Sequence, residues 1–383
     1  DSVDQSFHQD VAHDLATMIA RGPVTQSQIN DLVNLSPQSQ KRSNLFYLGT
    51  ETDRLGKKRS SLLVWDNYLQ MGDPSHLEDL EIQIRVAQLQ YDLGRESTAV
   101  KSFAKSCERW KKSGCDSEEK CNELQTRLRN FVISWNKKEK TRPSQQLSAV
   151  YSTYIDTFQN DYEMFYRSAL VARDVKSFQR ALKHYHRASL IAHREMERHD
   201  EKASQKLKNI FEASLLGEIE MAEIQNSLPK RRKAYLHYLK LNPTGEKNFE
   251  IRYQRAHVEY EAKKFKLAAR LFRSVTLHKN NRQRDLKVKA ADLALDSLAA
   301  LKNDPKLESW GREFAKRLPE RKHEYLKISR KATINLVAAT LNSKKSSRSD
   351  FKEAKKRLEA VSLAGASDKE KIAYFKNRLL VAE

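Results

Sequence analysis

The three cysteines of the chain lie close together and could form a disulfide or bind a metal. Cys107, Cys115 and Cys121 follow the spacing C-x7-C-x5-C, which matches no zinc pattern, and no histidine lies nearby. If Cys115 lies in a turn between two helices, Cys107 and Cys121 are at similar distances from it, and we expect these two to be close enough to bridge. Pairing of Cys115 with Cys121 is the other local option. A disulfide would indicate an oxidising compartment.

Four histidines, which are potential metal ligands or general bases, are grouped at His184, His186, His193 and His199. Metal ligation favours ligands four residues apart on a helix, with a third ligand nearby. His186 and His193 are seven apart, so we predict that the group forms the surface of a basic helix. No metal site and no cofactor are predicted.

No catalytic motif is found in the sequence. The patterns G-x-x-x-x-G-K, G-x-S-x-G and H-E-x-x-H are absent, and no carboxylate pair stands out from the many charged residues. We therefore predict no catalytic residue and expect that the protein is not an enzyme.

The composition favours a helical protein. Among 383 residues there are 10 Gly and 8 Pro, and 32% of the residues are charged. Few turn-forming residues argue against an all-β chain and against low-complexity disorder. The longest apolar runs, Leu62–Trp65 and Ile334–Leu341, are far shorter than the roughly 18 residues that suggest a membrane span. No transmembrane segment is predicted.

Positive charge is concentrated away from the N-terminus. The net charge is +21, yet residues 1–100 contain 9 basic and 14 acidic side chains, so the rest of the chain has a net charge of +26. This asymmetry predicts a basic surface that attracts acidic partners. Nucleic acid, anionic lipid, a cell-wall polymer and acidic protein all remain open.

Small and large apolar residues recur at matching offsets along the chain. The stretch Leu45–Pro74 contains Gly49, Gly56, Ser61, Trp65 and Tyr68. The same offsets give Ala87, Gly94, Ala99, Phe103 and Ser106. The pattern recurs with Ala169, Phe178, Ala181, Tyr185 and Ala188; with Ala256, Phe265, Ala268, Phe272 and Val275; and, in part, with Phe351, Ala354, Leu358 and Val361. Any amphipathic helical bundle also repeats apolar residues at three and four positions, so a generic bundle is the alternative interpretation.

This pattern resembles the tetratricopeptide repeat (TPR), a 34-residue helix–turn–helix with small residues where its two helices cross. The resemblance covers roughly residues 43–383 and implies an all-α, right-handed α-solenoid. We expect an N-terminal helical cap over 1–40 and a TPR-like solenoid over 41–383, which is complete or part of a longer array. The register places Ala99, Ala181 and Ala268 in buried helix crossings.

The resemblance also implies that the first helix of each repeat lines a concave groove for a protein or peptide. The groove residues carried over are Phe46, Arg54, Tyr91, Tyr166, Arg173, Tyr253, His257 and Tyr260, with Thr50, Ile84, Gln88 and Leu170 on the same helices. Tyr and Arg dominate many binding interfaces. The alternative is that these aromatic residues pack between repeats. The Lys/Asn carboxylate clamp of some TPR cochaperones is missing.

A basic run at Lys230, Arg231, Arg232 and Lys233 could belong to a nucleic-acid-binding surface, which requires a continuous basic stripe. HAT repeats, the TPR-like arrays of RNA-processing factors, make a cytoplasmic RNA- or ribonucleoprotein-binding protein the second hypothesis. We rank nucleic acid below a protein partner and keep an anionic polymer as a further candidate.

The leading hypothesis is a non-catalytic protein-interaction scaffold. The tyrosine-rich stretch Tyr151–Phe158 resembles bacterial cell-envelope TPR proteins. Together with the start at Asp1 rather than Met and with the cysteine cluster, this resemblance leads us to expect a periplasmic protein; the alternative is a cytoplasmic one.

Overall fold

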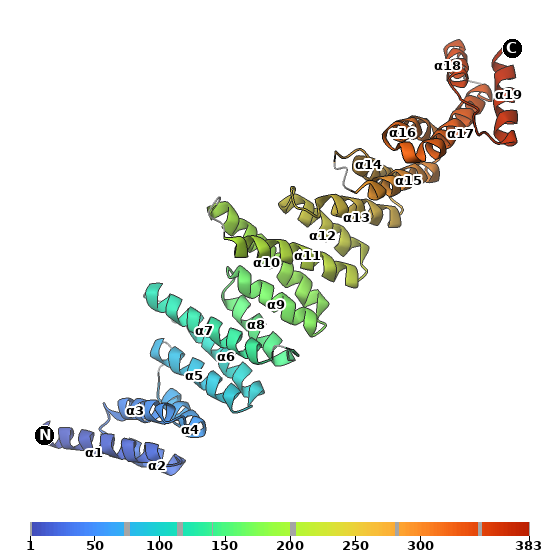
Figure 1. The fold of residues 1–383 in the computed structure, drawn as a ribbon. Helices are drawn as coiled ribbons and strands as arrows, with labels where there is room; N and C mark the ends of the chain where they lie inside the picture. The colour runs from blue at the N-terminus through green and yellow to red at the C-terminus, as the bar shows by residue number, and fades with distance from the viewer. Residues whose placement is uncertain are drawn as a thin grey trace. The chain divides into compact units, whose positions relative to one another are not determined.

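The computed structural model describes residues 2–72, 77–112, 118–139, 141–199, 204–279, 283–343 and 347–382. These residues form α-helices joined by short turns, with one 3-10 turn at Pro319–Arg321 (η2) and no strand within the described ranges (Figure 1). The chain divides into two compact units, Asp1–Ser214 and Leu215–Glu383. The predicted division into 1–40 and 41–383 stays a prediction.

The first unit contains ten helices and the beginning of an eleventh among the described residues. They are α1 (Ser2–Arg21), α2 (Gln26–Leu35), α3 (Lys41–Arg54), α4 (Lys58–Gln70), α5 (Leu77–Asp92), α6 (Glu96–Lys112), α7 (Glu118–Lys138), α8 (Gln145–Thr157), α9 (Tyr162–Asp174), α10 (Phe178–His199) and α11 (Gln205–Ile224). The second unit continues with α12 (Leu228–Leu241), α13 (Asn248–Glu261), α14 (Phe265–Thr276), α15 (Arg284–Ala300), α16 (Asp304–Arg317), α17 (Lys322–Leu341), α18 (Arg348–Glu359) and α19 (Asp368–Ala382).

One turn geometry recurs between the two helices of a hairpin. A single residue with positive φ ends the first helix at Gly56, Gly94, Lys176, Asn226, Lys263 and Lys302. After five of these six residues, the next backbone N–H donates to a carbonyl oxygen five residues back, at 2.7–3.0 Å. This bond defines the Schellman motif, which satisfies the last carbonyl groups of a helix. Five of these hairpins therefore share one turn geometry, as expected for the units of a repeat array.

Small residues allow the two helices of each hairpin to approach. Ala99, Ala181 and Ala268 have no exposed surface, which confirms the predicted register. In the first hairpin, a Cβ atom added to Gly49 would lie 2.6 Å from the indole ring of Trp65. No side chain larger than hydrogen fits there without movement of the ring. The structure thus confirms an all-α array of degenerate TPR-like repeats.

The apolar core is a succession of local clusters rather than one centre. In the first unit one cluster extends from Ala12 to Leu89 and another from Leu80 to Ile191. In the second unit the clusters are Phe249–Ala332 and Ile334–Tyr374. Most helices pack mainly against their hairpin partner and the next hairpin, as expected for a repeat array.

The N-terminal region forms two helices, α1 and α2. Thr25 is the N-cap of α2, and its hydroxyl and the side chain of Gln28 form a reciprocal capping box. Both α1 and α2 pack against α3; that they cap the array stays a prediction.

The predicted pairing of Cys107 with Cys121 is wrong. Cys107 is a buried free thiol on α6, and its burial raises its pKa to about 12. Cys121, on α7, is disulfide-bonded. Cys115, the other candidate partner, lies outside the described residues.

One predicted surface histidine is also buried. His184 on α10 is 7% exposed, and its Nδ1 lies 2.9 Å from the hydroxyl of Ser168 on α9. Burial, with Arg180 and Lys183 nearby, lowers its pKa to about 4. His184 is therefore a neutral core residue at physiological pH.

Candidate binding grooves

In the first unit, the first helices of three successive repeats line a groove of about 640 Å³. It is lined by Phe46, Thr50 and Asp53 of α3; Trp65 of α4; Glu81, Ile82, Ile84, Arg85 and Gln88 of α5; and Arg127, Asn130, Phe131 and Ser134 of α7. Sequence reasoning named Phe46, Thr50, Ile84 and Gln88 among these residues. It missed the contribution of α7, which matched the repeat pattern poorly.

The hairpin turn fixes which residues of a first helix are equivalent. Ten residues before the positive-φ residue, the four repeats have Phe46, Ile84, Tyr166 and Tyr253. Three residues before it, they have Asp53, Tyr91, Arg173 and Tyr260. Asp53, and not Arg54, is thus equivalent to Tyr91, Arg173 and Tyr260. The side chain of Arg54 instead pairs with Glu51 on its own helix at 2.8 Å.

Aromatic rings form the apolar side of the first-unit groove. Phe46 is 36% exposed, and its ring centroid is 5.5 Å from that of Trp65 in an edge-on arrangement. The indole Nε1 of Trp65 donates to Asp53 at 3.1 Å, which fixes the orientation of the ring. A partially exposed ring on a rigid support is a typical anchor for a partner.

The charged groups of this groove are paired with one another. The guanidinium of Arg85 donates two hydrogen bonds of 2.8 Å to the carboxylate of Asp53, and these raise the pKa of Arg85. Arg127 donates one hydrogen bond to Glu81 and two to Glu123 on its own helix. The groove therefore combines an apolar wall with neutral hydroxyl and amide groups and has little uncompensated charge.

The other predicted groove residues pack partly between helices. Tyr91 is 9% exposed and stacks on Trp135 with centroids 4.2 Å apart; burial raises its pKa to about 12. Tyr166 lies 6.0 Å from the ring of Tyr185. Arg173 forms an ion pair with the adjacent Asp174 at 3.1 Å.

On α13 the three predicted groove residues lie one after another along the helix. The rings of Tyr253 and Tyr260 lie 5.7 and 6.4 Å from that of Phe272 on α14. Between them, His257 contacts Glu261 at 2.8 Å. These two tyrosines contribute to the packing of the hairpin.

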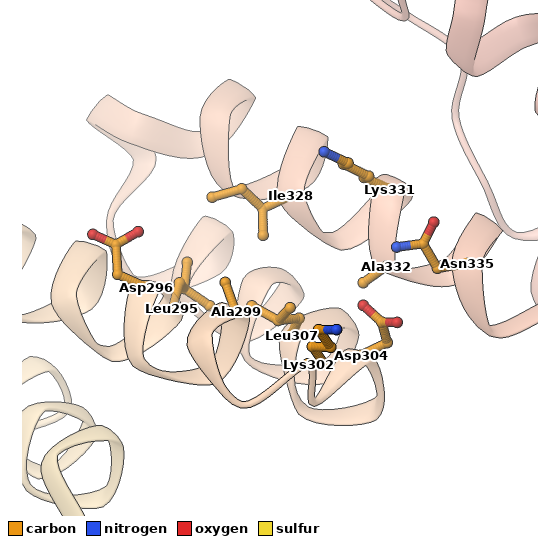
Figure 2. A pocket seen from close by; sticks show the side chains of 10 residues that line it. All are labelled: Leu295, Asp296, Ala299, Lys302, Asp304, Leu307, Ile328, Lys331, Ala332 and Asn335. Carbon is orange, nitrogen blue, oxygen red and sulfur yellow. The ribbon is translucent and has the colours of Figure 1, made fainter. Parts of the chain in front are cut away.

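A second cavity, of about 440 Å³, lies between α15, α16 and α17 in the second unit (Figure 2). It is lined by Leu295, Asp296, Ala299, Lys302, Asp304, Leu307, Ile328, Lys331, Ala332 and Asn335. No groove residue was predicted here, because the repeat pattern was not recognised between Val275 and Phe351. The signal present was Asn303-Asp304-Pro305, in which Asn303 caps α16 through the backbone N–H of Lys306.

Most side chains of the basic run at the start of α12 bind other residues of the protein. Arg231 pairs with Glu261, and Arg232 pairs with the buried Glu259 at 2.6 Å. The side chain of Lys230 donates to Gln225, while Lys233 is exposed. Two of the four cations are therefore neutralised by carboxylates of α13.

No family model matches the sequence, and no curated protein matches it. Among solved structures, the chain is similar to a tetratricopeptide repeat protein from Parabacteroides merdae, with 12% identity, 90% of this chain and 100% of that chain covered, and a TM-score of 0.28. It is also similar to the P58(IPK) TPR domain, with 14% identity, coverage of 99% and 98%, and a TM-score of 0.24. A circular tandem repeat protein matches with 12% identity, coverage of 99% and 89%, and a TM-score of 0.28.

TM-scores this low assign no family. The recurring turns and the buried small residues at the helix crossings are the features that make the chain a degenerate TPR-like array. Within the described ranges, no helix combines the length and the apolar character needed to cross a bilayer.

Proposed function

We propose that this protein is a non-catalytic protein-interaction scaffold that binds an extended segment of a partner in the groove of α3, α5 and α7. The observation that supports this most is the combination of the partly exposed ring of Phe46, supported by the buried Trp65, with neutral polar groups. Thr50, Gln88, Asn130 and Ser134 line the groove. The hydroxyls of Thr50 and Ser134 and the amide of Gln88 already donate within the protein, but their oxygens can still accept from a peptide backbone, and the amide of Asn130 can donate and accept.

The dimensions suit a short extended peptide. Neighbouring packed helices lie about 8–10 Å apart, so a path across three of them is about 20 Å long. An extended chain advances about 3.3 Å per residue, so roughly six residues would cross the groove. Because the charges of the groove are paired internally, apolar and backbone contacts would dominate the affinity.

Phe46→Ala is expected to weaken peptide binding at least about tenfold, because truncating an aromatic hot spot costs about 2 kcal/mol or more. Peptides are first selected on the protein from a phage-displayed library of random twelve-residue sequences. The dissociation constant of the best synthetic peptide is then measured by fluorescence polarisation for the protein, Phe46→Ala and Asn130→Ala.

Leu236→Ala is the matched control, since Leu236 on α12 is 40% exposed and lies outside the groove. The proposal is contradicted if selection yields no peptide, or if Phe46→Ala and Leu236→Ala bind the peptide equally well. Binding of labelled RNA that rising salt abolishes, without a selected peptide, would instead favour the nucleic-acid alternative.

We further propose that the protein functions in the bacterial cell envelope, in the periplasm. The disulfide-bonded Cys121 supports this setting, because disulfides persist mainly in oxidising compartments. An anionic polymer of the envelope is a further candidate partner for the basic second unit.

Thiol counting tests the compartment. Protein purified from its native source without reductant and then unfolded is expected to show one free thiol, that of Cys107. Three free thiols would count against the periplasmic proposal, whereas they would leave the groove proposal unaffected.

A further inference from the structure

The cavity between α15, α16 and α17 differs from the first-unit groove in the state of its charged groups. The groove pairs Asp53 with Arg85 and Glu81 with Arg127. The cavity is lined by four charged residues, Asp296, Lys302, Asp304 and Lys331. Within the part of the chain that the structure describes, none of these four side chains forms an ion pair or a side-chain hydrogen bond. They are therefore available to a ligand.

The two ends of the cavity carry different charged groups. In Figure 2, Asp296 stands at one end of the row of apolar side chains, and Lys302, Asp304, Lys331 and Asn335 lie toward the other. Asp304 lies in the first turn of α16, where the helix dipole favours a negative charge. One end thus presents a carboxylate, and the other presents two ammonium groups against one carboxylate.

The environment of Asp296 favours a cationic neighbour. Asp296 is exposed, yet partial desolvation of its carboxylate and the nearby Asp292 raise its pKa, which means that its negative charge is poorly compensated within the protein. A positive group of a ligand placed beside Asp296 would stabilise its negative charge.

The floor of the cavity is apolar. Between the two charged ends lie Leu295, Ala299, Leu307, Ile328 and Ala332. A volume of about 440 Å³ lies within the range of about 300–1,000 Å³ that is typical of ligand pockets. The floor therefore suits apolar side chains, and the two ends suit groups of opposite charge.

We propose that this cavity binds a segment of a partner protein in which apolar residues are flanked by a basic residue on one side and an acidic residue on the other. The basic residue lies at Asp296, and the acidic residue lies at Lys302 and Lys331. Because the second unit contains 39 Lys and Arg against 21 Asp and Glu, attraction by net charge alone would instead select a purely acidic segment. A preference for mixed charge is therefore specific to the cavity.

Four fluorescein-labelled peptides with blocked ends test the proposal. Each contains three leucines between serine spacers, flanked by Lys and Glu, by two Glu, by two Lys or by two Gln. At physiological salt the mixed peptide is expected to bind tightest, by about three- to tenfold, since exposed charge pairs contribute up to about 1 kcal/mol each. Tightest binding of the two-Glu peptide, or equal binding of all four, would overturn the proposal.

Charge reversals then locate the site. Asp296→Lys is expected to shift the preference to the two-Glu peptide, and Lys331→Glu to the two-Lys peptide. Lys316→Glu is the matched control, because Lys316 is exposed on α16 and lies outside the cavity. If Lys316→Glu reorders the peptides as Lys331→Glu does, the binding reflects net charge and the proposal fails.

Ala299→Trp fills the cavity from an exposed position and is expected to lower the affinity for the mixed peptide about tenfold with an unchanged thermal midpoint. Phe46→Ala is expected to leave this affinity unchanged. Failure of the cavity proposal is thus distinguishable from failure of the groove proposal.

Discussion

Glu163→Gln is expected to lower the free energy of unfolding at pH 7 by about 2–4 kcal/mol, because it removes the charge at the centre of a partly buried cluster. Glu163 on α9 is 9% exposed. Its carboxylate lies 2.8 Å from the nitrogens of three cations, Arg129 of α7, Arg167 of α9 and Lys206 of α11. The change leaves three positive groups facing a neutral amide.

The effect should depend on pH. Burial raises the pKa of Glu163, but the hydrogen bonds from Lys206, Arg167 and Arg129 outweigh it, and the pKa falls to about 2. In the unfolded chain the pKa of Glu is about 4.3. The stabilisation is therefore fully present above about pH 5 and is lost as pH falls toward 2.

Urea unfolding at pH 7, 5 and 3 measures this difference between the protein and Glu163→Gln. We expect the difference to shrink at pH 3. Glu108→Gln is the control, since Glu108 forms an exposed i,i+4 pair with Lys112, and no measurable change is expected. A difference that is equal at pH 7 and pH 3 would mean that the charge of Glu163 does not stabilise the fold.

Gly49→Ala is expected to destabilise the first unit by about 1–3 kcal/mol through overpacking. The added Cβ would lie 2.6 Å from the indole ring of Trp65. The ring has little freedom to move, because it is 2% exposed, donates to Asp53 and packs edge-on against Tyr68 at 5.7 Å.

A double-mutant cycle checks this mechanism. If the clash causes the loss, Gly49→Ala should cost less in a Trp65→Leu background than in the unmodified protein. Gly22→Ala is the matched control, since the nearest atom to its added Cβ is 3.9 Å away. If the two substitutions have additive effects, or if Gly22→Ala destabilises the protein as much as Gly49→Ala, the contact with Trp65 is not the cause of the loss.

The repeat register was predictable because close packing restricts residue size at helix crossings. Ala99, Ala181 and Ala268 are buried where the sequence pattern placed them. The turn residues themselves were not recognisable in most hairpins, because glycine occupies the positive-φ position at Gly56 and Gly94 but lysine or asparagine occupies the other four. The hairpin of α15 and α16, with its cavity, was missed because no copy of the repeat pattern was recognised between Val275 and Phe351.

Contacts between residues far apart in sequence explain the remaining differences. The run at residues 230–233 suggests a free basic patch, yet Arg232 pairs with Glu259, 27 residues away. Equal distance from a turn suggested a bridge from Cys107, whose thiol is instead buried. The groove was only partly predictable. Repeat spacing identifies Phe46, but the sequence of α7 does not follow the repeat pattern and gives no sign that Asn130 lines the same surface.

The recurring turn has a consequence for the evolution of the chain. Its geometry is maintained by backbone hydrogen bonds, and lysine at Lys176, Lys263 and Lys302 incurs only about 1–2 kcal/mol relative to glycine. Mutation can therefore erase the most recognisable residue of a repeat while its backbone persists. In such an array the backbone of a hairpin can outlast the residues by which its sequence would be recognised as a repeat.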